Sequence, residues 1–230
     1  MLTHPPIYPM SHLLRSLLLL GLLFIGACAG QTDQKRVVFF GDSITQGGAE
    51  PGGYISLMRD MVDTSRYELI GAGVSGNKVT DLEQRIQADV LDRQPDVVMI
   101  YIGINDVWHF FKFEGTTGTE PERYEAGLRN LAQQIKDAGA TVVFCTPTVI
   151  GEDVDSDSPE NTRLMEYADI VRTVADDTGS QLCDLREAYS TYLRQNNPNK
   201  AYEGILTRDG VHMNEEGNQF LAERMIDCLP

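Results

Sequence analysis

Short strand-like runs alternate with longer helix-like segments along the chain after residue 35. Between the strand-like runs, apolar residues recur at helical spacing, as in 52–62. This alternation predicts a three-layer α/β/α domain with a doubly wound, mostly parallel five-stranded sheet of flavodoxin-like order. The run 96–103 is the most continuous, so we expect it to be the central strand, buried on both faces. The predicted strands are 36–40, 67–70, 96–103, 140–145 and 181–185.

Capping signals mark where several helices begin. Thr80 and Glu83 have the spacing of a capping box, and Pro121 opens a helix after a longer connection. Ser158, which a proline follows, is a good N-cap. The last predicted helix covers 214–228. With 230 residues the chain suits a single α/β domain with a sizeable core.

The first predicted strand ends in Gly41, Asp42 and Ser43. In a parallel α/β sheet, ligands bind at the edge formed by the carboxyl ends of the strands, where the N-termini of the following helices point inward. Ser43 is therefore expected in an exposed turn at this edge. Three small residues are a weak signal by themselves, because such residues commonly form turns. A catalytic role for Ser43 requires partners elsewhere in the chain.

A serine nucleophile requires a base, and histidine is the usual one because its pKa lies near neutral pH. The sequence contains four histidines, of which only His109 and His212 follow residue 30. His212 comes three residues after Asp209. At this spacing the carboxylate can accept the Nδ1 proton and leave Nε2 facing Ser43. A lone histidine here would more simply be a surface or helix-cap residue, but its pairing with Asp209 favours catalysis.

Hydrogen-bond donors for an oxyanion are expected after the second and third strands. Gly76 can offer an unobstructed backbone N–H, and Asn105 a side-chain amide. Each has a simpler interpretation, since Gly76 also suits a turn with positive φ and Asn105 an Asx turn with Asp106. Asp42 and Asp106 are expected to hold their turns through bonds to backbone amides.

Four sequence blocks follow one another along the chain: Gly-Asp-Ser-Ile-Thr (41–45), Gly76, Gly-Ile-Asn-Asp (103–106) and Asp-Gly-Val-His (209–212). Together they closely resemble the four blocks of the SGNH/GDSL hydrolase family, over nearly the whole chain after residue 35. The sequence has no Gly-x-Ser-x-Gly motif, which disfavours the α/β-hydrolase fold.

This resemblance implies a serine esterase that needs no cofactor. In such an enzyme Ser43 is the nucleophile, His212 is the general base and acid, and Asp209 orients the histidine. The N–H groups of Ser43 and Gly76 and the amide of Asn105 form the oxyanion hole. Resemblance to exported members of the family implies small acyl groups, such as acetyl on carbohydrates.

Other functions stay open at this point. A lysophospholipase or thioesterase would use the same residues on lipid acyl chains, an acyltransferase would pass the acyl group to another alcohol, and a catalytically silent glycan-binding envelope lipoprotein would keep only the fold. Trp108 stands just beyond Asn105. It can form a wall for a sugar ring or an acyl chain, or part of a movable lid, or simply pack on its own domain.

The N-terminal segment has the layout of an export signal. The apolar run 17–25 follows Arg15 and precedes small residues, as in a secretory signal peptide, and it is shorter than the ~20 residues of a membrane span. Ile-Gly-Ala-Cys at 25–28 resembles a bacterial lipobox, which implies that Cys28 is lipidated and anchors the protein to a membrane. A plain signal peptide cut near Ala27 or Ala29 is the alternative, and Met10 is an alternative start.

We therefore expect a signal peptide at 1–30, a linker at 31–35 and a hydrolase domain at 36–230, in an exported protein of the periplasm or cell envelope. The formal net charge of -15 repels phosphate backbones, so nucleic acid is not an expected partner and any membrane contact is expected only through Cys28. The expected partner is a small-molecule or glycan ester, and the sequence does not indicate an oligomeric state.

Cysteines and acidic residues give no metal signature. The chain lacks Cys-x-x-Cys pairs and histidine clusters, so no zinc site is expected. The acidic stretch 152–157 lacks the glycine and closing glutamate of an EF-hand, and we expect it to be a solvated loop. A disulfide between Cys183 and Cys228 is compatible with an oxidising compartment, but the sequence does not decide it.

Overall fold

The computed structural model describes residues 1–4, 34–112 and 117–230. All strands and helices named below belong to the unit Thr32–Pro230. The apolar run and lipobox of the predicted signal peptide, with Cys28, lie outside the described residues. Among the described residues, no helix combines the length and apolarity needed to cross a bilayer.

Five parallel strands form one sheet in the order β2-β1-β3-β4-β5. This is the flavodoxin-like order, and it confirms the predicted doubly wound α/β fold. β3 lies at the centre and is buried along its whole length, as its continuous apolar sequence predicted. The strands are β1 (Lys35–Gly41), β2 (Tyr67–Gly73), β3 (Val97–Tyr101), β4 (Thr141–Cys145) and β5 (Gln181–Cys183).

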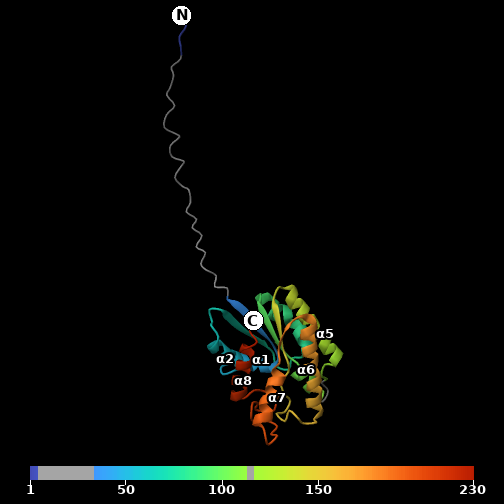
Figure 1. Cartoon of the computed structure of the whole chain (residues 1–230). Coiled ribbons are helices and arrows are strands. Elements are labelled where there is room, and N and C mark those ends of the chain that lie inside the picture. The colour runs from blue at the N-terminus through green and yellow to red at the C-terminus, as the bar shows by residue number, and fades with distance from the viewer. Residues whose placement is uncertain (5–33, 113–116) are drawn as a thin grey trace. The chain divides into compact units, whose positions relative to one another are not determined.

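Helices flank the sheet in two groups (Figure 1). In one group α2 packs against α1 and α8, and α8 also contacts α7; in the other, α5 packs between α3 and α6, and α4 contacts α6. The core lies between the sheet and these helices, and its largest fully buried side chains include Tyr54, Phe39 and Phe40. The helices are α1 (Ser43–Ala49), α2 (Tyr54–Met61), α3 (Val79–Asp89), α4 (Ile104–Trp108), α5 (Pro121–Asp137), α6 (Pro159–Thr178), α7 (Leu185–Asn196) and α8 (Glu215–Ile226), with a 3-10 turn at Leu91–Arg93.

Two helix starts differ from the sequence-based expectation. Helix α1 begins at Ser43 itself, whereas helical sequence was expected to resume only near residue 52. Helix α3 is capped at Lys78, whose N–H donates to the Asp81 carboxylate at 2.8 Å, so the predicted capping box of Thr80 and Glu83 is wrong. The predicted helix start at Pro121 and the predicted N-cap at Ser158 are confirmed.

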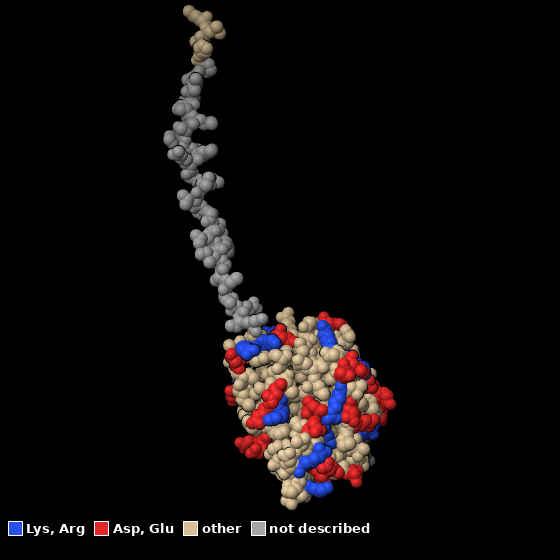
Figure 2. Space-filling model, in the orientation of Figure 1, with Lys and Arg blue, Asp and Glu red and all other residues tan. Residues whose placement is uncertain are grey.

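Charged side chains of both signs are interspersed on the face drawn in Figure 2. Many charged side chains of the described residues form exposed ion pairs, such as that of Arg129 with Glu125 and Asp177. Pairs of this kind contribute at most about 1 kcal/mol each, because water and salt screen them. The stability of the fold therefore comes mainly from burial of the apolar core.

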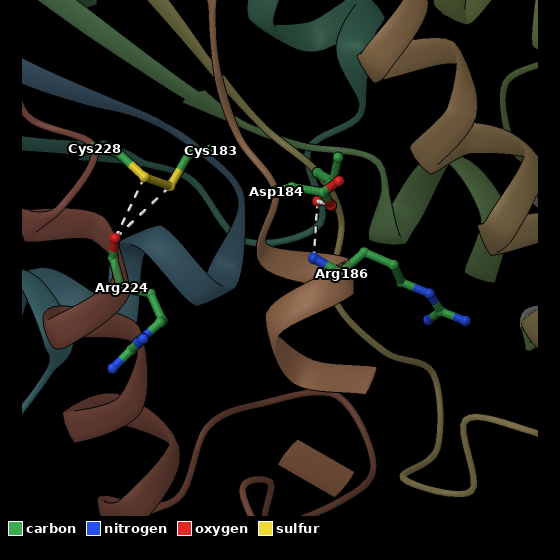
Figure 3. Close-up of a disulfide and its surroundings, with 6 residues drawn as sticks. Cys183, Asp184, Arg186, Arg224 and Cys228 are labelled. Carbon is green, nitrogen blue, oxygen red and sulfur yellow. Dashed lines mark hydrogen bonds between the residues drawn. A yellow bond between two sulfur atoms is a disulfide. The ribbon is translucent and has the colours of Figure 1, made fainter. Parts of the chain in front are cut away.

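A disulfide joins Cys183, the last residue of β5, to Cys228, which follows α8 (Figure 3). It resolves the alternative that the sequence left open. Both sulfur atoms lie near the carbonyl oxygen of Arg224, at 3.9 and 3.3 Å. Because the catalytic candidates Asp209 and His212 lie between the two cysteines in the sequence, the disulfide closes a loop that contains them. Among the cysteines in the described ranges, Cys145 is buried and forms no disulfide.

Candidate active site

Ser43 is held at the carboxyl end of β1 by the start of helix α1. The preceding residue, Asp42, is the N-cap, and its Oδ1 accepts a hydrogen bond from the Ile44 N–H at 2.9 Å. This confirms the expectation that Asp42 holds its turn through a backbone amide. Burial raises the pKa of Asp42 to about 7. As the first residue of a helix, Ser43 has an N–H that no earlier residue of that helix can accept, so the N–H is available to an anion.

Ser43, His212 and Asp209 form one hydrogen-bonded chain. The Ser43 Oγ lies 2.9 Å from His212 Nε2, and His212 Nδ1 lies 2.7 Å from Asp209 Oδ2. A carboxylate can only accept, so the proton lies on Nδ1 and Nε2 is left to accept the Ser43 hydroxyl proton. Such a histidine can take the serine proton as the serine attacks a carbonyl carbon.

Asp209 also shapes the turn that carries both residues. Its Oδ1 accepts the N–H groups of Val211 and His212 at 3.0 and 2.7 Å. Partial burial opposes ionisation of this carboxyl, but the hydrogen bonds from His212 and Val211 outweigh it and hold its pKa below the usual range. Gly210 has a φ of 82°, which an L side chain rarely adopts, so the turn requires glycine there.

Glu152 supports the segment before this turn, although the sequence suggested that it belongs to a solvated loop. The expectation is wrong for Glu152, which is only 1% exposed. Its carboxylate accepts the N–H groups of Ile205, Leu206 and Thr207 and the Thr207 hydroxyl, at 2.8, 2.6, 2.6 and 2.9 Å. These donors compensate the burial of the charge. The neighbouring Asp155 is exposed, as expected.

The two remaining oxyanion-hole candidates follow β2 and β3. Gly76 is exposed, and its φ of 78° explains the glycine by turn geometry. Asn105 is 4% exposed and lies in the first turn of α4. Its Nδ2 donates to the Asn77 carbonyl at 3.0 Å, which uses one of its two protons and fixes the amide beside the Gly76 turn. Asp106 accepts the Val79 N–H at 3.1 Å. This is a bond to a backbone amide, as expected, but it fixes the start of α3 and not the turn of Asp106 itself.

Arg85 joins the loops that carry these candidates. Its guanidinium donates to the carbonyl oxygens of Gly41 and Ala72 at 2.7 and 2.9 Å, and to Asn77 Oδ1 at 2.6 Å. It therefore connects the ends of β1 and β2 with the turn that contains Gly76. No sequence pattern indicates this role, because a single arginine on a helix is usually solvated.

Trp108 lies against the catalytic candidate His212. The centroids of the two rings are 6.3 Å apart and their planes meet at 64°, an edge-to-face contact. The Nζ of Lys112 lies 5.3 Å from the centroid of the indole. The structure thus brings Trp108 to the same edge of the sheet as Ser43 and His212. In the described ranges, no group of three or more His, Cys, Asp and Glu side chains is arranged to hold a metal ion.

Comparison with known proteins shows the family. The model of the GDSL-like lipase/acylhydrolase family matches residues 39–220, which is most of the chain. The chain belongs to this family. Carboxylic ester hydrolysis is the reaction of its esterase members, and this GDSL hydrolase is an enzyme of that type.

Several proteins similar to this GDSL hydrolase bear the names of esterases. An acetylxylan esterase of Geobacillus stearothermophilus is 30% identical over 210 residues, which cover 84% of this chain and 92% of that protein. The isoamyl acetate-hydrolyzing esterase 1 homolog of Homo sapiens is 26% identical and covers 88% and 87% of the two chains. Among solved structures, the acetyl xylan esterase AlAXEase has a TM-score of 0.82 and 43% identity, and the match covers 85% of this chain and all of that one.

The structure brings several of the predicted site residues of this GDSL hydrolase together. Ser43, His212 and Asp209 are connected by direct hydrogen bonds, and Trp108 contacts His212. Asn105 and the Gly76 turn are connected through Asn77. Glu152 is buried and Arg85 is half-buried, and the sequence did not indicate the supporting role of either residue.

Proposed function

We propose that this GDSL hydrolase is an exported esterase that removes acetyl groups from carbohydrates by an acyl-enzyme mechanism. The observation that carries the proposal is the hydrogen-bonded chain from Ser43 through His212 to Asp209, with distances of 2.9 and 2.7 Å. In this series of hydrogen bonds, the weakly nucleophilic hydroxyl of Ser43 is bonded to a base, His212, whose tautomer is fixed by Asp209.

In the first step, Ser43 Oγ attacks the ester carbonyl carbon while its proton passes to His212 Nε2. The oxyanion that forms accepts hydrogen bonds from the N–H groups of Ser43 and Gly76 and from the second amide proton of Asn105. The C–O bond to the sugar then breaks, and His212 returns the proton to the departing sugar hydroxyl. Asp209 stabilises the imidazolium between these transfers.

In the second step, water replaces the sugar. The water oxygen attacks the carbonyl carbon of acetyl-Ser43 while His212 takes a proton from the water. His212 then protonates Ser43 Oγ as acetate departs. Every step is a proton transfer or an acyl transfer between groups of the protein, the ester and water. The proposed reaction therefore requires no cofactor.

The relatives support carbohydrate acetate as the substrate, because two of them are acetylxylan esterases at 30% and 43% identity. Trp108 supports it as well, since an indole beside the catalytic histidine offers a flat apolar surface for a sugar ring. Export is supported by the signal-like sequence before residue 31 and by the Cys183–Cys228 disulfide, which is typical of oxidising compartments. The lipobox sequence supports a lipid anchor on Cys28.

Hydrolysis of p-nitrophenyl esters from acetate to palmitate tests the chemistry, and release of acetate from acetylated xylo-oligosaccharides tests the substrate. We expect activity on acetate that falls steeply beyond butyrate and disappears in Ser43→Ala, with an unchanged melting temperature. Activity that rises with acyl length would support a lipid substrate instead. Activity retained in Ser43→Ala would overturn the assignment of Ser43 as the nucleophile. Transfer of the acetyl group from one sugar to another would identify an acyltransferase.

Export and lipidation need their own experiment. We expect the full chain, expressed in a bacterium with labelled palmitate, to carry the label and to fractionate with the envelope. Cys28→Ala should lose the label. A wild-type chain that is exported without label would identify a plain signal peptide.

A further inference from the structure

Tyr202 is a half-exposed aromatic residue that lies on the backbone of two glycines. Its side chain is 49% exposed. A Cβ added to Gly210 would come within 2.3 Å of Tyr202 Cε1, and one added to Gly151 within 2.7 Å of Cε2. The ring thus contacts both glycines at distances that no other residue would permit. With part of the ring covered by this backbone and half of the side chain exposed, an apolar surface of the ring is open to solvent.

The two glycines that support the ring are fixed to each other. The Gly151 N–H donates to the Gly210 carbonyl at 2.8 Å, and the Glu152 N–H donates to the Tyr202 carbonyl at 2.8 Å. Gly151 and Gly210 both have positive φ, of 83° and 82°. The ring is therefore held before any ligand arrives, which lowers the entropic cost of binding.

This ring adjoins the catalytic turn. Gly210 lies directly after Asp209 and two residues before His212. Trp108 contacts the imidazole of His212 itself. Two aromatic side chains thus flank the segment 209–212, one against its glycine and one against its histidine.

The charge around Tyr202 selects the chemistry of a ligand. Burial and the nearby carboxylates of Glu160, Asp209 and Glu203 raise the pKa of Tyr202, so its hydroxyl stays neutral. These carboxylates repel anionic headgroups and phosphates, and they can accept hydrogen bonds from hydroxyl groups. An uncharged, hydroxyl-rich ligand with apolar ring faces fits an aromatic surface in such surroundings.

We infer that Tyr202 is a stacking platform for a sugar ring of the acetylated saccharide, next to the sugar whose acetyl group is removed. The inference rests on the proposed carbohydrate esterase function and specifies one subsite of it. The platform binds the saccharide beyond the scissile ester, so it does not contact a small ester such as p-nitrophenyl acetate. It is expected to affect KM for oligosaccharides and to leave the chemistry on small esters unchanged.

The test compares Tyr202→Ala, Tyr202→Phe and the control Met61→Ala on two substrates, acetylated xylo-oligosaccharide and p-nitrophenyl acetate. Met61 is a matched control because it is 48% exposed and lies at the end of α2, which precedes the amino end of β2 and hence the opposite edge of the sheet. We expect Tyr202→Ala to raise KM for the oligosaccharide about 10-fold, as loss of one stacking contact commonly does. Its kcat/KM on p-nitrophenyl acetate should stay within about 2-fold of wild type, since it does not touch the reacting atoms. Tyr202→Phe and Met61→Ala should resemble wild type on both substrates.

The outcomes separate the two proposals. If wild type releases no acetate from the oligosaccharide and does not bind the deacetylated oligosaccharide by calorimetry, the proposed substrate and the platform both fail. If wild type is active but Tyr202→Ala has a kcat/KM that is reduced equally on both substrates, the platform alone is overturned. The same holds if the kcat/KM of Tyr202→Ala is reduced on neither substrate. Sedimentation of each variant completes the test: a smaller mass for Tyr202→Ala than for wild type would assign the ring to contact with a second copy of the chain and overturn the platform.

Discussion

The Glu152 carboxylate accepts hydrogen bonds from both the N–H and the hydroxyl of Thr207, which lies 55 residues later in the sequence. The Thr207 hydroxyl in turn accepts the Gly210 N–H at 3.1 Å. A short chain of hydrogen bonds therefore connects a buried charge to the turn that carries Asp209 and His212. Small displacements of catalytic groups cost activity steeply, so the conformation of this turn matters for the rate.

We expect Glu152→Gln to lower kcat on p-nitrophenyl acetate by about 10-fold to 100-fold, with little change in KM. The amide keeps the volume of the side chain, but its NH₂ group faces backbone donors that need an acceptor, so the segment 205–207 must shift. Steady-state kinetics well below the melting temperature measure this effect. Asp155→Asn is the control, because Asp155 is exposed and pairs with Arg194 at the surface. A variant with a lower melting temperature but unchanged kcat would show that Glu152 serves stability alone.

The proposed division of roles between His212 and Asp209 predicts unequal losses of activity. We expect His212→Ala to reduce kcat by roughly 10⁶-fold and Asp209→Asn by roughly 10⁴-fold, as in other serine triads. The asparagine keeps an oxygen for the Val211 and His212 N–H groups, so the turn is retained while the acceptor of the Nδ1 proton is lost. The Asp209 side chain is 44% exposed, which lets water replace part of the lost interaction. Equal losses in the two variants would contradict the proposed supporting role of Asp209.

Asn105 is predicted to act on the transition state. We expect Asn105→Ala to lower kcat by roughly 10²–10³-fold and to leave KM nearly unchanged, since an oxyanion-hole donor binds a charge that develops only during the reaction. Asn105→Asp keeps the size of the side chain but offers no NH₂ group, so we expect its kcat to fall by as much. A change confined to KM would assign Asn105 to substrate binding.

The fold was predictable from the sequence because its signals are local. Neighbouring residues define an apolar run or a helical repeat, and the run 96–103 correctly indicated the central strand β3. Helix α1 was missed because Ser43–Ala49 contains two glycines and little apolar periodicity. Its formation depends on the Asp42 cap and on packing against α2 and β2.

The site was predictable only in part, for the same reason. Ser43, Asp209 and His212 belong to short motifs whose spacing is visible in the sequence. Glu152 and Arg85 act through backbone groups that are 53 to 55 and 13 to 44 residues away, and no local pattern encodes those partners. The acidic run 152–157 and the helical residue Arg85 are therefore typical of a solvated surface by sequence alone, although Glu152 is buried.

The disulfide predicts sensitivity of the fold to reductant. Cys183 and Cys228 are 45 residues apart, and a loop of that length corresponds to about 4 kcal/mol in the chain-entropy model. We expect dithiothreitol to lower the melting temperature of wild type by several degrees. The double variant Cys183→Ser, Cys228→Ser should melt at the lower temperature with or without reductant. An unchanged wild-type melting temperature after full reduction would show that the bond adds no stability.

The buried Asp42 carboxyl predicts a pH-dependent difference between wild type and Asp42→Asn. Because the pKa is raised from 3.8 in the unfolded chain to about 7 in the fold, the unfolded state loses its proton first as pH increases. Asp42 therefore costs no stability below pH ~4, an increasing amount from pH ~4 to ~7, and a constant amount above that, reaching roughly 4 kcal/mol.

Asparagine can still accept the Ile44 N–H as an N-cap but does not ionise. We expect Asp42→Asn to gain stability relative to wild type as pH rises from 4 to 7, measured as the free energy of unfolding in urea at each pH. Repulsion from Asp106 contributes to the raised pKa of Asp42, so the difference between the two proteins includes this coupling as well as the burial of Asp42. A difference that stays constant over this range would contradict the raised pKa, and a decreasing one would show that Asp42 is ionised and favourably paired in the fold.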